Sequence, residues 1–145
     1  MATINSTNFS GDTLEIIAFR LHDQEFCVKT TTIREIRGWA PSTPIPHAPK
    51  DVVGVMNLRG TVIPIIDLAY KLGMQSTAAN ERSAIVVTEV RNMIIGMLVD
   101  RVTANDALVT RLLSDRELHE FFSSAFLEAL YHQIHADASI ASVSP

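Results

Sequence analysis

Short apolar runs, each bounded by polar residues or glycine, follow one another along the chain as far as residue 109. Neighbouring runs that are joined by only two or three turn residues predict β-hairpins. The runs 83–90 and 93–99 are almost continuously apolar, which is typical of strands buried on both faces. The predicted hairpins pair 14–21 with 25–29, 52–58 with 61–68, and 83–90 with 93–99, and a further strand is expected over 102–109.

Prolines interrupt this pattern in two places. Four of them fall within nine residues of the segment 40–50. Because each proline fixes φ and lacks a backbone donor, this segment is predicted to be a loop or an extended connector. The run 61–68 contains Pro64, which predicts an edge strand or a bulge at that position.

The apolar spacing changes to three and four residues near the C-terminus, which predicts one amphipathic helix over 112–135. Ser114 followed by Glu117 has the form of a capping box, so the helix is expected to begin directly after the serine. The segments 1–13 and 136–145 are small and polar and are expected to be flexible tails. Many short strands followed by one helix favour small β-barrels with a covering helix.

Composition narrows the class of protein. The chain has 145 residues, of which 47% are hydrophobic and 19% charged, which is too apolar for a disordered chain. A net charge of −4 opposes a nucleic-acid partner, because affinity for phosphate backbones comes from clustered Lys and Arg. No transmembrane run is present, so no direct membrane insertion is expected. The single cysteine, Cys27, forms no internal disulfide, and a cytoplasmic location is expected.

Catalytic and ligand-binding signatures are sparse. None of the six glycines forms a phosphate-binding loop, and the only close histidine pair, His132 and His135, lacks an evident third ligand. We therefore expect no cofactor and no metal. Asp67 and Asp100 each end an apolar run, where they either accept backbone N–H bonds or form an acid/base pair. The first alternative predicts no catalysis, and the second predicts a hydrolase.

Four motifs follow one another over 33–68: IREIRG, PIPHAP, GVMNLRG and VIPIIDL. In this order and spacing they resemble the CheW family of bacterial chemotaxis coupling proteins. Weaker similarity extends to FRLHDQEFCV at 19–28 and IIGMLVDRV at 94–102. The resemblance covers residues 14 to about 109.

The resemblance implies a mainly β fold of two SH3-like β-barrel subdomains and no enzymatic activity. It places the CheW-like domain at 14–135, with a first barrel at 14–72, a partial second barrel at 83–111 and the helix at 112–135. The implied partners are the regulatory domain of a CheA-type histidine kinase and the cytoplasmic tip of methyl-accepting chemoreceptors, in membrane-associated arrays. The implied partner-binding residues are Ile33, Glu35, Ile36, Arg37, Asn57, Leu58, Arg59, Val99 and Val102.

The physical chemistry of these residues fits such a role. Ile33, Ile36 and Leu58 are expected to offer apolar anchors to a partner helix, each contributing about 1.5–3 kcal/mol when fully buried. Glu35 and Arg59 are expected to flank these anchors and to set the register of the partner. The site is therefore expected to be an apolar groove with one acidic and one basic residue beside it.

The C-terminal part departs from the family pattern, because 112–135 is predicted as a helix where family members carry a closing strand. The second barrel is then either completed by this helix or left incomplete. Three other functions stay open: an adaptor for another receptor–kinase array, such as one for surface motility, the acid/base hydrolase, and a small β-barrel that binds nucleic acid.

Overall fold

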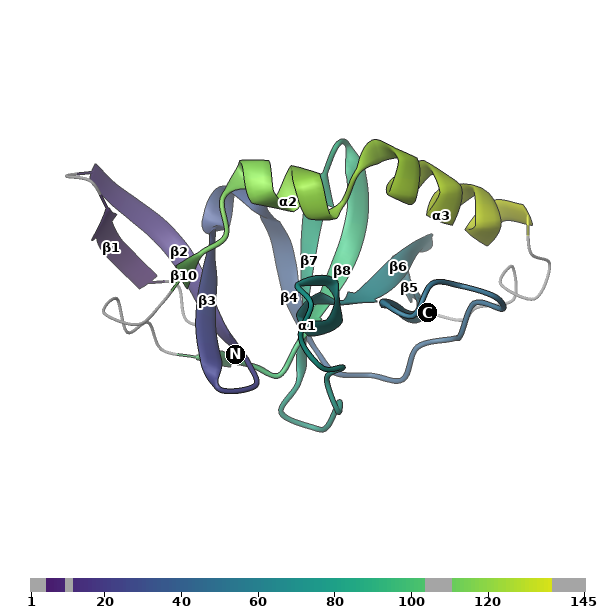
Figure 1. The fold of residues 1–145 in the computed structure, drawn as a ribbon, viewed down its shortest axis with the longest axis horizontal. Coiled ribbons are helices and arrows are strands. Elements are labelled where there is room, and N and C mark those ends of the chain that lie inside the picture. Colours follow the sequence, from purple (N-terminus) through teal and green to yellow (C-terminus); the bar gives the residue numbers. More distant parts are fainter. Residues whose placement is uncertain (1–4, 10–11, 104–110, 137–145) are drawn as a thin grey trace.

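The computed structural model describes residues 5–9, 12–103 and 111–136, which form two five-stranded sheets with two helices along one side (Figure 1). The first sheet has the order β1-β2-β3-β10, and β9 also pairs with β2. The second sheet has the order β4-β7-β8-β6-β5. The strands of the first sheet are β1 (Asn5–Phe9), β2 (Asp12–Leu21), β3 (Gln24–Lys29), β9 (Arg101–Thr103) and β10 (Arg111–Leu112). Those of the second are β4 (Ile33–Gly38), β5 (Val52–Leu58), β6 (Thr61–Asp67), β7 (Ala84–Val90) and β8 (Met93–Val99).

All three predicted hairpins are confirmed, as β2–β3, β5–β6 and β7–β8. The second and third are closed by two residues that both have positive φ, which is the geometry that matches the twist of a tight hairpin. Arg59 and Gly60 have φ of 50° and 89°, and Arg91 and Asn92 have φ of 52° and 66°. Each hairpin therefore has its register fixed by its turn.

The two sheets do not follow the division of strands that was expected for barrels at 14–72 and 83–111. β2 and β3 pair with β9 and β10, whereas β4, β5 and β6 pair with β7 and β8. The parallel pairing of β6 with β8 places β6 inside the second sheet, so the first alternative for Pro64, an edge strand, is wrong. The second alternative, a bulge, lies close to it, because the β5–β6 register shifts between Val52 and Gly54, opposite Ile66 and Ile65. The proline is tolerated because pairing with β8 begins only at Ile65.

The two ends of the chain also differ from the sequence prediction. Part of the expected tail 1–13 forms β1, which pairs antiparallel with the start of β2. The expected strand 102–109 is described only as far as Thr103, within β9, and the rest lies outside the described residues, as does 137–145.

The expected single helix over 112–135 is wrong, because the segment forms β10 followed by two helices. These are α2 (Asp115–Phe121) and α3 (Ser124–Ala136). The capping box of Ser114 and Glu117 is confirmed at the start of α2. The chain leaves the helix at Phe122, and the Ser123 hydroxyl then accepts the Phe126 amide at 3.2 Å, so a second helix starts instead of the first continuing.

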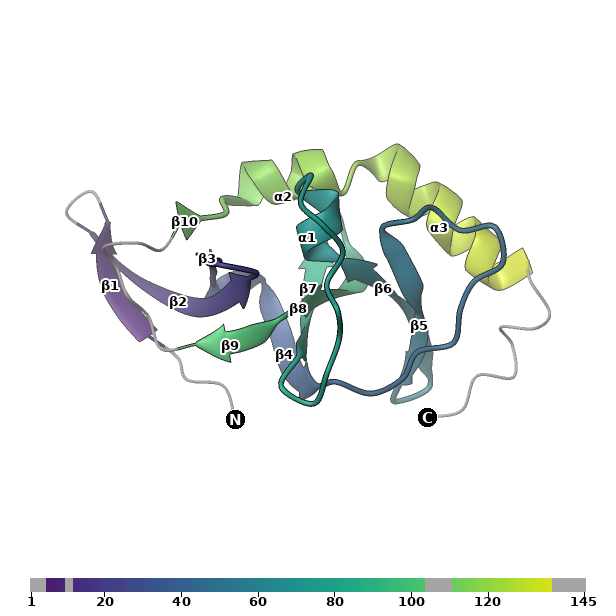
Figure 2. The same ribbon diagram turned by 60° about the horizontal axis from the view of Figure 1, so that its bottom comes forward.

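A large core lies between the two sheets and the helices, and α2 and α3 run along both sheets in the two views (Figures 1 and 2). The apolar stripe of the helices packs into this core and is not left exposed. A separate, small core fills the other face of the curled second sheet. The helix residues of the large core are Leu118, Phe122, Leu127, Leu130 and Ile134. The small core consists of Leu58, Ile63, Ile65, Ile85, Val87 and Leu98.

Candidate functional site

Side chains alternate between the two faces of β4, and this alternation decides which motif residues meet. Glu35 and Arg37 lie opposite Val87 and Ile85 of β7, which belong to the small core. Ile36 lies opposite Val86, which belongs to the large core. Because successive residues of a strand point to opposite faces, the two charged residues share one face of the second sheet and Ile36 occupies the other.

Glu35 is the centre of a charged cluster that we define as Glu35, Arg37 and Arg59. Its carboxylate accepts a hydrogen bond from Arg37 Nη1 at 3.2 Å and another from Arg59 Nη2. The hydrogen bond from Arg59, together with that from Arg37, lowers the pKa of Glu35 below its ordinary value. The side chain of Glu35 is 25% exposed and that of Arg59 is 70% exposed, so the cluster presents its positive charge outward.

The turn between β5 and β6 positions Arg59. Its positive φ and that of Gly60 form the tight hairpin, and the Asn57 side chain accepts the Gly60 amide at 2.8 Å. β4 and β5 are the opposite edge strands of the second sheet. The contact between Glu35 and Arg59 therefore bridges β4 and the hairpin that follows β5, at opposite edges of the sheet.

The predicted arrangement of apolar anchors beside these charges is wrong. Leu58 is 7% exposed and belongs to the small core, and Val99 is fully buried in the large core. Three of the predicted residues are half-buried and pack against the large core: Ile33, Ile36 and Val102. Ile36 lies on the side of the sheet opposite Glu35. A strand cannot place adjacent residues on one face, so a contiguous run of motif letters does not form a contiguous surface.

Other half-buried apolar side chains lie on the side of the charged cluster and were missed by sequence reasoning. Trp39, Met56 and Ile94 all pack against the small core. Strand alternation could have identified two of them, because residues two positions apart lie on the same face of a strand. Trp39 follows Arg37 by two positions, and Met56 precedes Leu58 by two. These residues supply the apolar surface that the sequence prediction assigned to Ile36 and Leu58.

The proline-containing segment covers the outer edge of β5. Thr43 and Val55 exchange two backbone hydrogen bonds, of 2.9 and 2.8 Å. A Cβ at Gly54 would lie 2.5 Å from the Thr43 carbonyl oxygen, so glycine is needed for this close approach. The motif glycine thus serves the fold and closes an edge that would otherwise pair with another chain.

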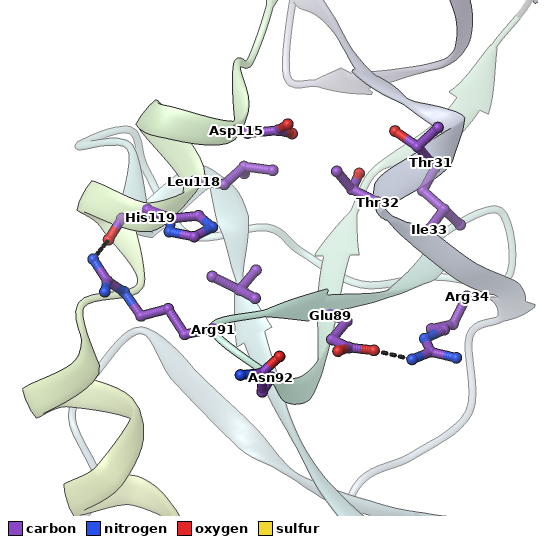
Figure 3. Close-up of a pocket in the computed structure, with 11 residues that line it drawn as sticks. Thr31, Thr32, Ile33, Arg34, Glu89, Arg91, Asn92, Asp115, Leu118 and His119 are labelled. Atoms are coloured by element: carbon purple, nitrogen blue, oxygen red, sulfur yellow. Dashed lines mark hydrogen bonds and ion pairs between the residues drawn. The ribbon is translucent and has the colours of Figure 1, made fainter.

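A cavity of about 670 Å³ lies at the other end of β4, between η1 (Thr30–Thr32), the tip of the β7–β8 hairpin and α2. Figure 3 shows Ile33 on one wall and Leu118 on the opposite wall. Arg91 ties the hairpin to the helix by donating to the carbonyl oxygens of His119 at 3.0 Å and Phe122 at 3.2 Å. Ile33 is therefore accessible to a partner through this cavity.

The two strand-end carboxylates act as backbone acceptors in separate places. Asp67 is buried and accepts the amides of Tyr70 at 3.3 Å and Thr77 at 2.8 Å. Asp100 accepts the amide of His22 at 2.7 Å. These bonds are what the non-catalytic alternative predicts, so the geometry gives the acid/base hydrolase no support.

Within the described residues, no helix is both long and apolar enough to cross a membrane. Over the same part of the chain, His, Cys, Asp and Glu side chains form no group of three that could hold a metal ion.

Comparisons with known proteins identify relatives of this chain. Residues 15–130 match the family described as CheW-like domain. The chain is 50% identical over 104 residues to the Chemotaxis protein CheW of Rhizobium meliloti (strain 1021), covering 72% of this chain and 64% of that protein. It is 54% identical over 89 residues to the Probable chemotaxis protein CheW of Rhizobium etli, covering 61% of this chain and 57% of that protein.

A solved structure is similar as well. The crystal structure of scaffolding protein TtCheW from Thermoanaerobacter tengcongensis matches with a TM-score of 0.59 and 29% identity, covering 62% of each chain. The expected fold class, mainly β with two SH3-like β-barrel subdomains, agrees with this similarity and with the two sheets, although neither sheet is closed within the described residues. The matched part spans roughly three fifths of the length of these relatives.

Proposed function

The chain belongs to the CheW-like domain family, and on that premise we propose that it is a non-enzymatic adaptor that couples methyl-accepting chemoreceptors to a CheA-type histidine kinase. The observation that carries the proposal is the contact between Glu35 and Arg59. It joins the first and third of the four ordered motifs into one exposed cluster, although 24 positions separate the two residues in sequence.

The charged cluster suits recognition of another protein. Exposed charges at the rim of an interface contribute to partner selection and register more than to affinity. Arg59 is the most exposed member, and Trp39 and Met56 supply apolar surface around the small core on the same side. This combination of a charged rim with half-buried apolar side chains is the composition of a protein interface.

The candidate partner-binding residues take two roles in this proposal. Six of them contact the kinase regulatory domain or the receptor tip directly, because their side chains are exposed or only partly buried. Three hold that surface in place: one closes the hairpin turn and two fill the cores. The first group is Ile33, Glu35, Ile36, Arg37, Arg59 and Val102, and the second is Asn57, Leu58 and Val99.

The proposed location is the cytoplasmic side of membrane receptor arrays, reached by binding to receptors. An adaptor for another receptor–kinase array, such as one for surface motility, is the second candidate. The names of the most similar relatives reported above favour chemotaxis. Binding to a chemoreceptor signalling fragment separates the two candidates, because only the first predicts it.

Charge reversal tests the proposal. Arg59→Asp is expected to weaken pull-down of the receptor fragment or of the kinase regulatory domain at least tenfold, with a nearly unchanged melting temperature, since exposed ion pairs add little stability. Arg116→Asp is the matched control, because Arg116 is an exposed arginine on α2 whose side chain is 90% accessible. Unchanged binding of Arg59→Asp, or equal losses in both variants, would contradict the proposal.

A second variant tests whether the partner recognises the charges themselves or whether the ion pair only holds the two edges of the sheet together. Glu35→Arg combined with Arg59→Glu restores an internal ion pair but presents its charges in reverse order. If the partner recognises the charges themselves, this double variant binds as poorly as the single one. If the pair serves only to hold the two edges of the sheet together, the double variant regains binding, and the surface assignment is wrong.

A further inference from the structure

A second, polar cavity of about 430 Å³ lies where β2 ends and β9 begins, beside the loop that follows α1 (Leu68–Lys71). Arg20, Arg82 and Arg101 line it. The only acidic residue in its lining is Asp100. Three arginines therefore line the cavity with one carboxylate residue, in a chain whose net charge is −4.

The arginines are largely without negative partners. Arg20 and Arg101 lie directly opposite each other on the paired strands β2 and β9, an arrangement that is unfavourable for like charges. Arg20 Nη2 donates to the Asp23 carbonyl oxygen at 2.8 Å. Within the described residues, the side chains of Arg82 and Arg101 have no hydrogen-bond or ion-pair partner. Arg20 faces Glu25 on its other side, but Glu25 accepts Thr103 Oγ1 at 2.6 Å and does not line the cavity.

The walls of the cavity are held by hydrogen bonds. The Asp100 carboxylate already accepts the His22 amide at 2.7 Å, so it is engaged by the turn after β2. The His22 ring is hydrogen-bonded through Nε2 to the Gln75 carbonyl oxygen at 2.7 Å, which fixes the loop against that turn. Asn80 Oδ1 accepts the Arg82 amide at 2.8 Å. These bonds connect Asp100, the turn after β2 and the loop that follows α1 around the cavity.

We propose that this cavity binds an oxyanion of phosphate or carboxylate chemistry that carries two or more negative charges. Guanidinium groups present paired N–H donors that match such oxygens, and charge-assisted bonds of this kind are stronger than neutral ones. A bound anion between Arg20 and Arg101 removes the repulsion across β2 and β9. The site lies outside the charged cluster of Glu35, Arg37 and Arg59 and does not depend on the adaptor function.

The test is titration of the full chain with pyrophosphate and, separately, with citrate at ionic strength held constant with NaCl. We expect saturable binding by calorimetry and a saturable rise in melting temperature with at least one of the two anions. Arg101→Gln and Arg82→Gln should each weaken the binding about tenfold. Arg101→Gln should not lower the melting temperature of the anion-free protein, because it removes a repulsive neighbour of Arg20.

Arg116→Gln is the control, since it removes the same charge from an exposed helix position that does not line the cavity. Binding of pyrophosphate alone assigns the site to phosphate chemistry, binding of citrate alone to carboxylate chemistry, and both outcomes support the proposal. The absence of saturable binding by either anion overturns it, as does an equal loss in Arg116→Gln and Arg101→Gln. If Arg101→Gln does not fold, Arg82→Gln, on an exposed loop, decides the result.

Discussion

Truncation of Leu58 distinguishes a core residue from a partner-binding anchor. Leu58 is 7% exposed and packs with Ile63, Ile65 and Leu98 in the small core. Leu58→Ala removes buried side-chain atoms whose burial stabilises the fold by roughly 2 kcal/mol, and it leaves a cavity. The expected loss of unfolding free energy is therefore about 3 kcal/mol. For a chain of this size that loss corresponds to a melting temperature lower by about 10 °C.

The assay is thermal and urea unfolding of the variant followed by circular dichroism, together with receptor pull-down at a temperature where the variant stays folded. The structure predicts a large loss of stability and binding that is retained below the transition. Ile33→Ala is the contrasting variant, because Ile33 is half-buried at the 670 Å³ cavity. It should cost about 1 kcal/mol and weaken binding. A Leu58→Ala protein with unchanged stability and abolished binding would refute the assignment of Leu58 to the core.

Three further predictions follow from buried and charged groups. Lys71→Met should lower the unfolding free energy by about 3 kcal/mol in urea titrations, because Lys71 Nζ lies 3.0 Å from the largely buried carboxylate of Asp51. Adding Asp51→Leu should restore part of the lost unfolding free energy, because it removes the unpaired carboxylate. The lowered pKa of Glu35 means that its pairing adds stability above its ordinary pKa of 4.5 and loses it as pH falls through the lower folded-state value. The melting-temperature difference between wild type and Glu35→Gln should therefore shrink on acidification, and a difference independent of pH would contradict this. Burial raises the pKa of the Cys27 thiol to about 11, so a thiol reagent at pH 8 should label the native protein far more slowly than the urea-unfolded one, and equal rates would show that the thiol is exposed.

The sequence predicted the hairpins well because their signals are local. Arg59 with Gly60, and Arg91 with Asn92, are two-residue connections between apolar runs, and the backbone takes positive φ at all four. β1 was missed because its residues are small and polar, and a strand that depends on backbone pairing leaves no hydrophobic pattern. The break at Phe122 was missed because the apolar spacing continues through it, although the Ser123 hydroxyl caps the start of the second helix.

The candidate site was predictable in its residues but not in its arrangement. The ordered motifs singled out Glu35 and Arg59, which the structure brings into contact. Their contact depends on the curl of the second sheet, because β4 and β5 are opposite edges of it, and no local pattern encodes that curl. The inward position of Leu58 follows from strand alternation once the partner of each strand is known.

We propose that this chain bridges two other proteins, and sedimentation velocity measures such bridging without a label or a surface. The full chain would be mixed with the regulatory domain of a CheA-type kinase and a soluble receptor signalling fragment, alone and together. We expect a ternary species that sediments faster than either binary mixture and disappears with Arg59→Asp but persists with Arg116→Asp. Components that sediment separately in every mixture, at concentrations well above a micromolar Kd, would contradict it.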